Sequence, residues 1–261
     1  MIHINLTKQN ISLVIPFKSG HSVLYGTFLN LFKVMDIDHE IVNDPSNKLE
    51  NVFIFTRNPI DRFFSGYFWM SSSDKQYESF NEKYNIYDLQ SYIKNYLRFI
   101  NGEPNAHYLP QSAQILAKNV KGPFEVNLFM NHRKKYDECY PGGHKIFRVE
   151  DITANVNLNY DIMVSKKVGV YPNVKLLQDV EFKKFPFLEM FSVDVNLLFM
   201  SLYEMFTKYN QISNHHKNTN YYNKVSLQEY NQVFNYFQYE LNWFGYEKDD
   251  EIVKKLANNI V

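Results

Sequence analysis

The chain has 261 residues, 45% of them hydrophobic and 21% charged, so it can bury a sizeable core and is not intrinsically disordered. Its 28 Lys and Arg residues balance 28 Asp and Glu residues, which excludes a protein that coats nucleic acid by means of a basic excess. Any anionic ligand must therefore be held by a local cluster of basic side chains.

The chain contains one cysteine, Cys139, which excludes an intrachain disulfide framework and a zinc site built from several cysteines. Its N-terminal residues contain no small-residue cleavage site of the kind that ends a signal peptide. No stretch approaches the roughly 18 apolar residues of a membrane span. No repeat or flexible linker divides the chain. We therefore expect a single domain over residues 1–261 that is soluble and cytoplasmic.

Two short apolar runs predict buried strands, each followed by a loop and a helix. The first run covers residues 11–17 (ISLVIPF) and the second covers residues 51–56 (NVFIFT), and apolar residues at helical spacing resume after each loop. Pro59 suits the first turn of the second helix, because the N–H that proline lacks has no helical partner at that position.

A third apolar run predicts a third strand over residues 145–149 (KIFRV). Repeated strand–loop–helix units are typical of an α/β fold, here a three-layer sandwich with a central parallel sheet flanked by helices. The C-terminal half is expected to be rich in helix, with helices over residues 194–209 and 226–237. Ser226 and Glu229 form a capping box at the start of the second of these helices.

The loop after the first strand offers groups that bind an anion. Lys18 supplies a charge, Gly20 lets a ligand approach the backbone closely, and Ser19 and Ser22 supply hydroxyls. The helix that follows presents N–H groups of its first turn, which attract phosphate. The sequence does not match the Walker pattern, because Lys18 precedes the glycine. The alternative is a tight strand–helix turn with a capping serine.

The loop after the second strand contains two of the chain's five arginines, Arg57 and Arg62. Arg57 can form two hydrogen bonds to a phosphate, and Ser65 in the following helix can add a hydroxyl. Arg62 with Asp61 is alternatively a structural ion pair. Two anion sites at two strand ends fit a nucleotide with phosphates at both ends.

These residues resemble a known family. Segment 18–22 (KSGHS) resembles the 5′-phosphosulfate loop of sulfotransferases that use 3′-phosphoadenosine 5′-phosphosulfate (PAPS). Segment 57–67 (RNPIDRFFSGY) resembles their 3′-phosphate motif, R-[DN]-P-x-x-R-x-x-S-x-Y. The branch indicated is the Golgi-type carbohydrate sulfotransferases with their soluble microbial and viral relatives. Further segments resemble that branch in the same order: 107–111 (HYLPQ), 147–152 (FRVEDI), 214–218 (NHHKN), 221–222 (YY) and 244–246 (FGY).

The resemblance implies a P-loop-like fold and transfer of the sulfuryl group from PAPS to a hydroxyl, with a carbohydrate as the expected acceptor. Lys18 would be catalytic, stabilising the departing phosphate oxygen, and the family needs no metal for the transfer. The remaining cofactor contacts that it implies are Ser19, Gly20, His21, Ser22 and Val23 for the 5′-phosphate side, Arg57 and Ser65 for the 3′-phosphate, and Lys217 as a residue that closes over the cofactor or acceptor.

Two residues are candidates for the general base that deprotonates the acceptor hydroxyl. His107 is favoured because an imidazole titrates near neutral pH and because Pro110 would rigidify its segment. Its alternative is a solvated loop histidine. Glu40 lies where more distant heparan-type sulfotransferases have a Glu after the first helix; its alternative is a surface carboxylate.

Two other functions remain open on the sequence. One is a nucleotide-dependent phosphotransferase with a related P-loop-like fold, although a Walker lysine and a metal-binding Asp after a strand are missing. The other is a non-catalytic nucleotide- or glycan-binding relative. No His, Asp and Glu cluster has recognisable metal-ligand spacing, and we assign most of the 20 Tyr and 22 Phe residues to the core.

Overall fold

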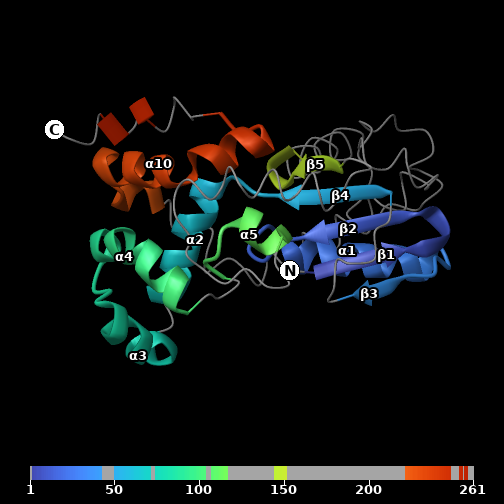
Figure 1. Ribbon diagram of the computed structural model, residues 1–261, viewed down its shortest axis with the longest axis horizontal. Helices are drawn as coiled ribbons and strands as arrows, with labels where there is room; N and C mark the ends of the chain where they lie inside the picture. The colour runs from blue at the N-terminus through green and yellow to red at the C-terminus, as the bar shows by residue number, and fades with distance from the viewer. Residues whose placement is uncertain are drawn as a thin grey trace, which may run out of the picture.

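The structure is a computed structural model that describes residues 2–42, 50–71, 74–103, 107–116, 144–151, 221–247, 253–254 and 256–257. Its strands form one sheet in the order β3-β1-β2-β4-β5. Figure 1 shows the sheet on the right and most of the helices on the left. The strands are β1 (Ile2–Leu6), β2 (Ile11–Ile15), β3 (Glu40–Val42), β4 (Asn51–Thr56) and β5 (His144–Arg148).

The three strands predicted from the apolar runs pair with one another in parallel. β2 pairs with β4 from Ile11 opposite Asn51, and β4 pairs with β5 as far as Thr56 opposite Arg148. β4 has the predicted bounds, and β5 begins and ends one residue earlier than predicted. β2 ends at Ile15, before the predicted residue 17, because Pro16 has no N–H to donate to a neighbouring strand.

The sheet is mixed, so the expected all-parallel sheet is wrong on one side. β1 is antiparallel to both β2 and β3. The chain reverses between β1 and β2 through a 3₁₀ turn over Thr7–Gln9. Asn10, which follows this turn, adopts the left-handed region at φ 56°. Because β1 and β2 are neighbours along the chain, this short turn connects them without the helical crossover that parallel strands need.

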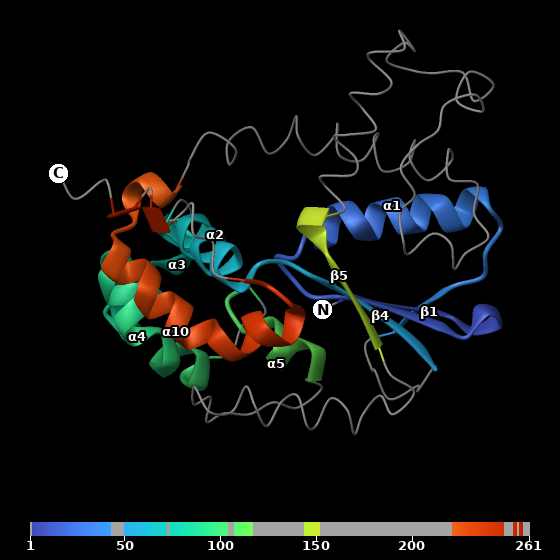
Figure 2. The same ribbon diagram turned by 90° about the horizontal axis from the view of Figure 1, so that it is seen from above.

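The described helices are α1 (His21–Val34), α2 (Pro59–Ser71), α3 (Asp74–Tyr84), α4 (Leu89–Gly102), α5 (Gln111–Leu116) and α10 (Leu227–Phe244). α1 runs along one face of the sheet, whereas α5 and the end of α10 lie against the other face (Figure 2). On this second face Ile115 and Phe244 pack against Val14, Val52 and Ile54. The sheet is therefore covered on both faces.

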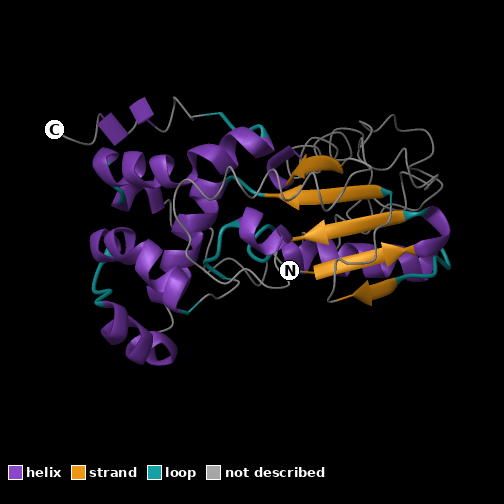
Figure 3. Ribbon diagram, in the orientation of Figure 1, coloured by secondary structure: helices purple, strands orange, loops and turns teal. Residues whose placement is uncertain are grey.

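A second body of helices lies beyond the carboxyl ends of β2 and β4 (Figure 3). α2, α4 and α10 pack there through aromatic side chains. The ring centroid of Phe63 lies 5.0 Å from those of Tyr92 and Tyr96 and 5.8 Å from that of Phe237. This packing confirms that many aromatic residues belong to the core.

Helix boundaries follow local signals in the sequence. α2 begins at Pro59 as predicted. The predicted helix from residue 226 is confirmed as α10, with Ser226 as N-cap and the Ser226–Glu229 capping box formed. α10 continues past residue 237 and ends at Phe244, because Gly245 adopts the left-handed region at φ 74°. The helix predicted over residues 194–209 lies outside the described residues. No helix in the described ranges has the length and apolar character needed to cross a membrane.

A buried polar trio joins β1 to β2. The His3 Nε2 atom lies 3.1 Å from the Ser12 hydroxyl, which donates to the Asn5 side-chain oxygen. His3 is 1% exposed, and this burial lowers the pKa of its imidazole to about 4. The folded protein therefore holds His3 neutral at pH values where an unfolded chain would protonate it.

Replacing His3 with glutamine is expected to flatten the acid limb of the stability curve. Because the folded pKa lies below the unfolded value, the contribution of His3 is complete above about pH 6.5 and is lost as the pH falls toward 4. The full loss corresponds to on the order of 3 kcal/mol. Urea unfolding between pH 4 and 7 measures it. Equal pH slopes for wild type and His3→Gln would contradict the assignment.

Candidate functional site

The loop between β2 and α1 has a backbone that glycine makes possible. Gly20 lies at φ 67°, and a Cβ at this position would come within 3.2 Å of the Val149 side chain. Gly20 is the N-cap of α1, and no side chain in the described part of the chain caps that helix. The alternative of a capping serine is therefore not what the structure has. The first-turn N–H groups, which belong to His21, Ser22 and Val23, are oriented to receive an anion.

The serines of this loop have different partners. The Ser19 hydroxyl is buried and donates to the side-chain oxygen of Gln111. The Ser22 hydroxyl lies 3.3 Å from His21 Nε2. His21 Nδ1 in turn accepts a hydrogen bond from the Lys18 N–H at 3.3 Å, so His21 steadies the turn in which Lys18 is left-handed at φ 65°.

The loop between β4 and α2 is held by the segments that the resemblance singled out. The Asn58 N–H donates to Glu150 Oε1 at 2.8 Å, and the Tyr246 hydroxyl lies 2.8 Å from Glu150 Oε2. The Tyr246 hydroxyl is also 3.1 Å from the Thr56 carbonyl oxygen at the end of β4. Glu150 and Tyr246, from two of these segments, therefore meet segment 57–67 at the end of β4.

Gln111 connects the two loops. Its side-chain oxygen accepts from the Ser19 hydroxyl and, at 2.9 Å, from the Arg57 N–H, and its amide nitrogen donates to the Arg57 carbonyl oxygen at 2.7 Å. One turn later in α5, the Gln114 side-chain oxygen accepts from the Phe17 N–H at 2.8 Å. The sequence located Gln111 in segment 107–111 without assigning it a role, because its partners lie far away along the chain.

A stack of side chains brings two predicted catalytic residues together. The Lys18 Nζ atom lies 4.2 Å from the centre of the Trp69 ring, on which the His107 ring stacks with centroids 4.5 Å apart and planes 25° apart. Phe17 contacts the His21 ring at 4.9 Å and the His107 ring at 6.0 Å. Sequence reasoning missed Trp69. Its signal was its position one helical turn after Ser65, on the same face of α2.

Burial and mutual repulsion lower the pKa values of this cluster. Burial, followed by the charges of Arg57 and Arg62, lowers the pKa of Lys18 to about 8. Burial also lowers the pKa of His107, and Lys18 and Arg62 add to this effect. Burial lowers the pKa of His21 to about 4. At neutral pH the cluster therefore has positive charges on Lys18 and the two arginines and two neutral imidazoles, which suits an anionic ligand and a proton acceptor.

Arg62 has a structural role. It is 2% exposed, and its Nε donates to the Phe17 carbonyl oxygen at 3.0 Å, which ties α2 to the first loop. The neighbouring Asp61 accepts a hydrogen bond from the Tyr222 hydroxyl. Arg57 and Ser65 are half-buried, one at the end of β4 and the other inside α2.

Glu40 is not brought to this cluster. It is exposed at the start of the edge strand β3, where it pairs with Asn5 of β1. Asn5 lies opposite Ser12, near the amino end of β2, whereas Lys18 follows the carboxyl end of that strand. Of the two base candidates, the structure places only His107 beside Lys18.

Other predicted features lie outside this cluster. Lys217 and Cys139 are outside the described residues. Within the described ranges no group of three or more His, Cys, Asp and Glu side chains is arranged to hold a metal ion. A cavity of about 110 Å³ lies between α2, α3 and α4, and none of the predicted site residues lines it. Its lining residues are Tyr67, Met70, Ser71, Asn81, Ile86, Tyr87, Asp88 and Tyr92.

Comparisons with known proteins leave the site to be interpreted from its own geometry. No protein-family model, no curated protein and no solved structure matches the chain.

Proposed function

We propose that this chain is an enzyme, a sulfotransferase that uses PAPS and sulfates a hydroxyl of an acceptor, with a carbohydrate as the expected acceptor class. The observation that supports the proposal most is the hydrogen bonding of Gln111 to both loops. Segments of the sequence that resemble the sulfotransferase family contribute side chains that meet around two strand ends. We also propose that the fold belongs to the P-loop-like class.

The residues present fit a doubly phosphorylated nucleotide. The start of α1 has N–H groups without a side-chain cap. Gly20 permits the left-handed backbone at φ 67° that precedes them, packed against Val149. Lys18 and Arg57 add two cations near two different strand ends, so two phosphates can be held apart from each other. In this proposal Ser19 to Val23 hold the 5′-phosphate, and Arg57 and Ser65 hold the 3′-phosphate.

When bound, PAPS supplies the sulfuryl group, whose sulfur–oxygen bond to the 5′-phosphate breaks as the bond to the acceptor hydroxyl forms. The Lys18 ammonium stabilises negative charge on the departing oxygen. The neutral His107 imidazole takes the proton of the acceptor hydroxyl. Trp69 contacts both side chains, the Lys18 ammonium over its ring and the His107 ring by stacking, and so helps to fix their orientations.

Thermal unfolding with adenosine 3′,5′-bisphosphate, AMP and ATP tests the nucleotide assignment. At a ligand concentration 100 times the Kd, the bisphosphate is expected to add about 2.7 kcal/mol of stability, which raises the Tm by several degrees. AMP lacks the 3′-phosphate and is expected to stabilise less. An equal effect of ATP would contradict the assignment. Arg57→Ala is expected to remove most of the bisphosphate effect, whereas Arg98→Ala, at an exposed arginine of α4, is the matched control.

A further inference from the structure

Glu240 is a buried carboxyl group in an apolar part of α10. It is 1% exposed, and its neighbours on the helix, Phe237, Leu241 and Phe244, belong to the core. Burying an ionisable group is unfavourable unless it gains hydrogen bonds or an opposite charge. The hydrogen bonds of this carboxyl group therefore indicate its role in the structure.

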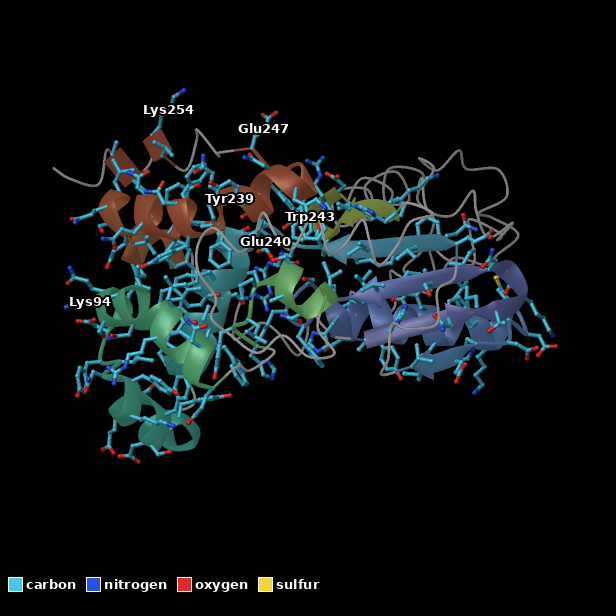
Figure 4. The ribbon with its side chains drawn as sticks, in the orientation of Figure 1. Lys94, Tyr239, Glu240, Trp243, Glu247 and Lys254 are labelled. Atoms are coloured by element: carbon cyan, nitrogen blue, oxygen red, sulfur yellow. The ribbon has the colours of Figure 1, made fainter. Side chains whose placement is uncertain are left out.

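Glu240 binds the first turn of α5. Its Oε1 atom accepts a hydrogen bond from the backbone N–H of Ser112, which is the second residue of that helix. First-turn N–H groups have no partner inside their own helix, so a side chain from another element must satisfy them when they are buried. Figure 4 shows Glu240 on the side of α10 that faces α5, whereas Lys94, Glu247 and Lys254 point outward.

The buried Glu240 carboxyl and the buried Arg62 guanidinium influence each other electrostatically. Burial raises the pKa of the Glu240 carboxyl, while the Ser112 N–H and the charge of Arg62 lower it in part. The same carboxylate raises the pKa of the buried Arg62 guanidinium, which burial lowers. Glu240 therefore binds the start of α5 and interacts electrostatically with the arginine that binds the first loop.

The residue before Ser112 is Gln111, whose side chain bonds to both anion loops. A shift of the first turn of α5 would move the Gln111 amide away from the Ser19 hydroxyl and from the Arg57 backbone. Gln111 is 0% exposed, so solvent water does not reach its side chain to replace these hydrogen bonds. The position of the two loops therefore depends on the bond that Glu240 makes.

We propose that Glu240 is a positioning residue for the anion loops, acting through the first turn of α5 and Gln111. Its hydrogen bond goes to α5, and its role is to fix the helix whose glutamine aligns the two loops. The inference rests on the proposed function only in its use of a nucleotide as the probe. The hydrogen bond from the Ser112 N–H to Glu240 and the bonds from Gln111 to the loops do not depend on which anion binds there.

Calorimetric titration with adenosine 3′,5′-bisphosphate tests the proposal. Glu240→Ala is expected to weaken binding at least tenfold, because it leaves the Ser112 N–H without its acceptor. Glu240→Gln is expected to stay within about threefold of wild type, because its amide oxygen still accepts that bond. Leu241→Ala, which creates a cavity in the same helix, is the matched control: it lowers the Tm and leaves the affinity unchanged. Equal affinity losses for Glu240→Ala and Leu241→Ala would overturn the proposal.

Glu240→Asp decides the question if Glu240→Ala does not fold. It keeps the carboxyl group but shortens the side chain by one methylene, so the carboxyl no longer reaches the Ser112 N–H and binding is expected to weaken. Affinity equal to wild type for Glu240→Asp would overturn the positioning role.

Amide hydrogen exchange in the absence of nucleotide separates this inference from the proposed function. The N–H groups of Phe17 and Arg57 donate to Gln114 and Gln111, so they are expected to exchange faster in Glu240→Asp than in wild type. Unchanged exchange at both would overturn the role of Glu240. If wild type bound no bisphosphate, the proposed function would fail and the exchange measurement would still test Glu240.

Discussion

Replacing Lys18 with alanine is expected to lower kcat for the proposed sulfuryl transfer by about 10²- to 10³-fold, the usual effect of removing one group that stabilises charge in the transition state. Lys18 belongs to the first loop and lies over Trp69, in a cluster that also contains Arg57 and Arg62. The measurement is the initial rate with PAPS and a carbohydrate acceptor panel. Lys33→Ala, at an exposed lysine of α1, is the control. A wild-type rate for Lys18→Ala would remove Lys18 from the mechanism.

The same lysine predicts an alkaline limit for the proposed sulfuryl transfer. Because the pKa of Lys18 in the free protein is about 8, kcat/KM is expected to fall as the pH rises past this value. Lys18→Arg keeps a positive charge at all these pH values, so its alkaline limb is expected to be flat, whatever its absolute rate. An unchanged alkaline limb in Lys18→Arg would assign the limb to another group.

Replacing His107 with alanine is expected to lower kcat by about 10²- to 10⁴-fold, the range for loss of a general base. The pKa of His107 is lowered by burial and by Lys18 and Arg62, so the wild-type rate is expected to hold below pH 6.5 and to decline only at more acidic pH. His39→Ala, at an exposed histidine after α1, is the matched control. A pH profile of His107→Ala that parallels wild type would assign the base to another residue.

Elements with strong local signals could be predicted from the sequence. β4 has the predicted bounds because an unbroken apolar run lies between polar residues. α10 starts at the predicted capping box. β1 was missed because its polar residues His3 and Asn5 look solvent-exposed in the sequence. They are buried because Ser12, on the neighbouring strand, provides hydrogen bonds to both.

For the site, sequence reasoning found the charged and small residues of the loops but not the groups that align them. Lys18, Gly20 and Arg57 follow strand ends, and this position is visible in the sequence. Gln111 and Glu240 act on backbone groups of other elements, and nothing in their neighbouring residues indicates those partners. Glu240 falls among the apolar positions of α10 with Phe237, Leu241 and Phe244, so its spacing indicates burial but not the group that it binds.

The hydrogen bonds around the loops also indicate at which stage of folding the site forms. Arg57 and Gln111 are 54 residues apart, Asn58 and Glu150 are 92 apart, and Ser112 and Glu240 are 128 apart. Closing such long loops of chain is unfavourable in entropy until many other contacts have formed. The proposed anion site is therefore a property of the fully folded chain and of no single segment, so we expect a ligand bound there to stabilise the whole molecule against global unfolding.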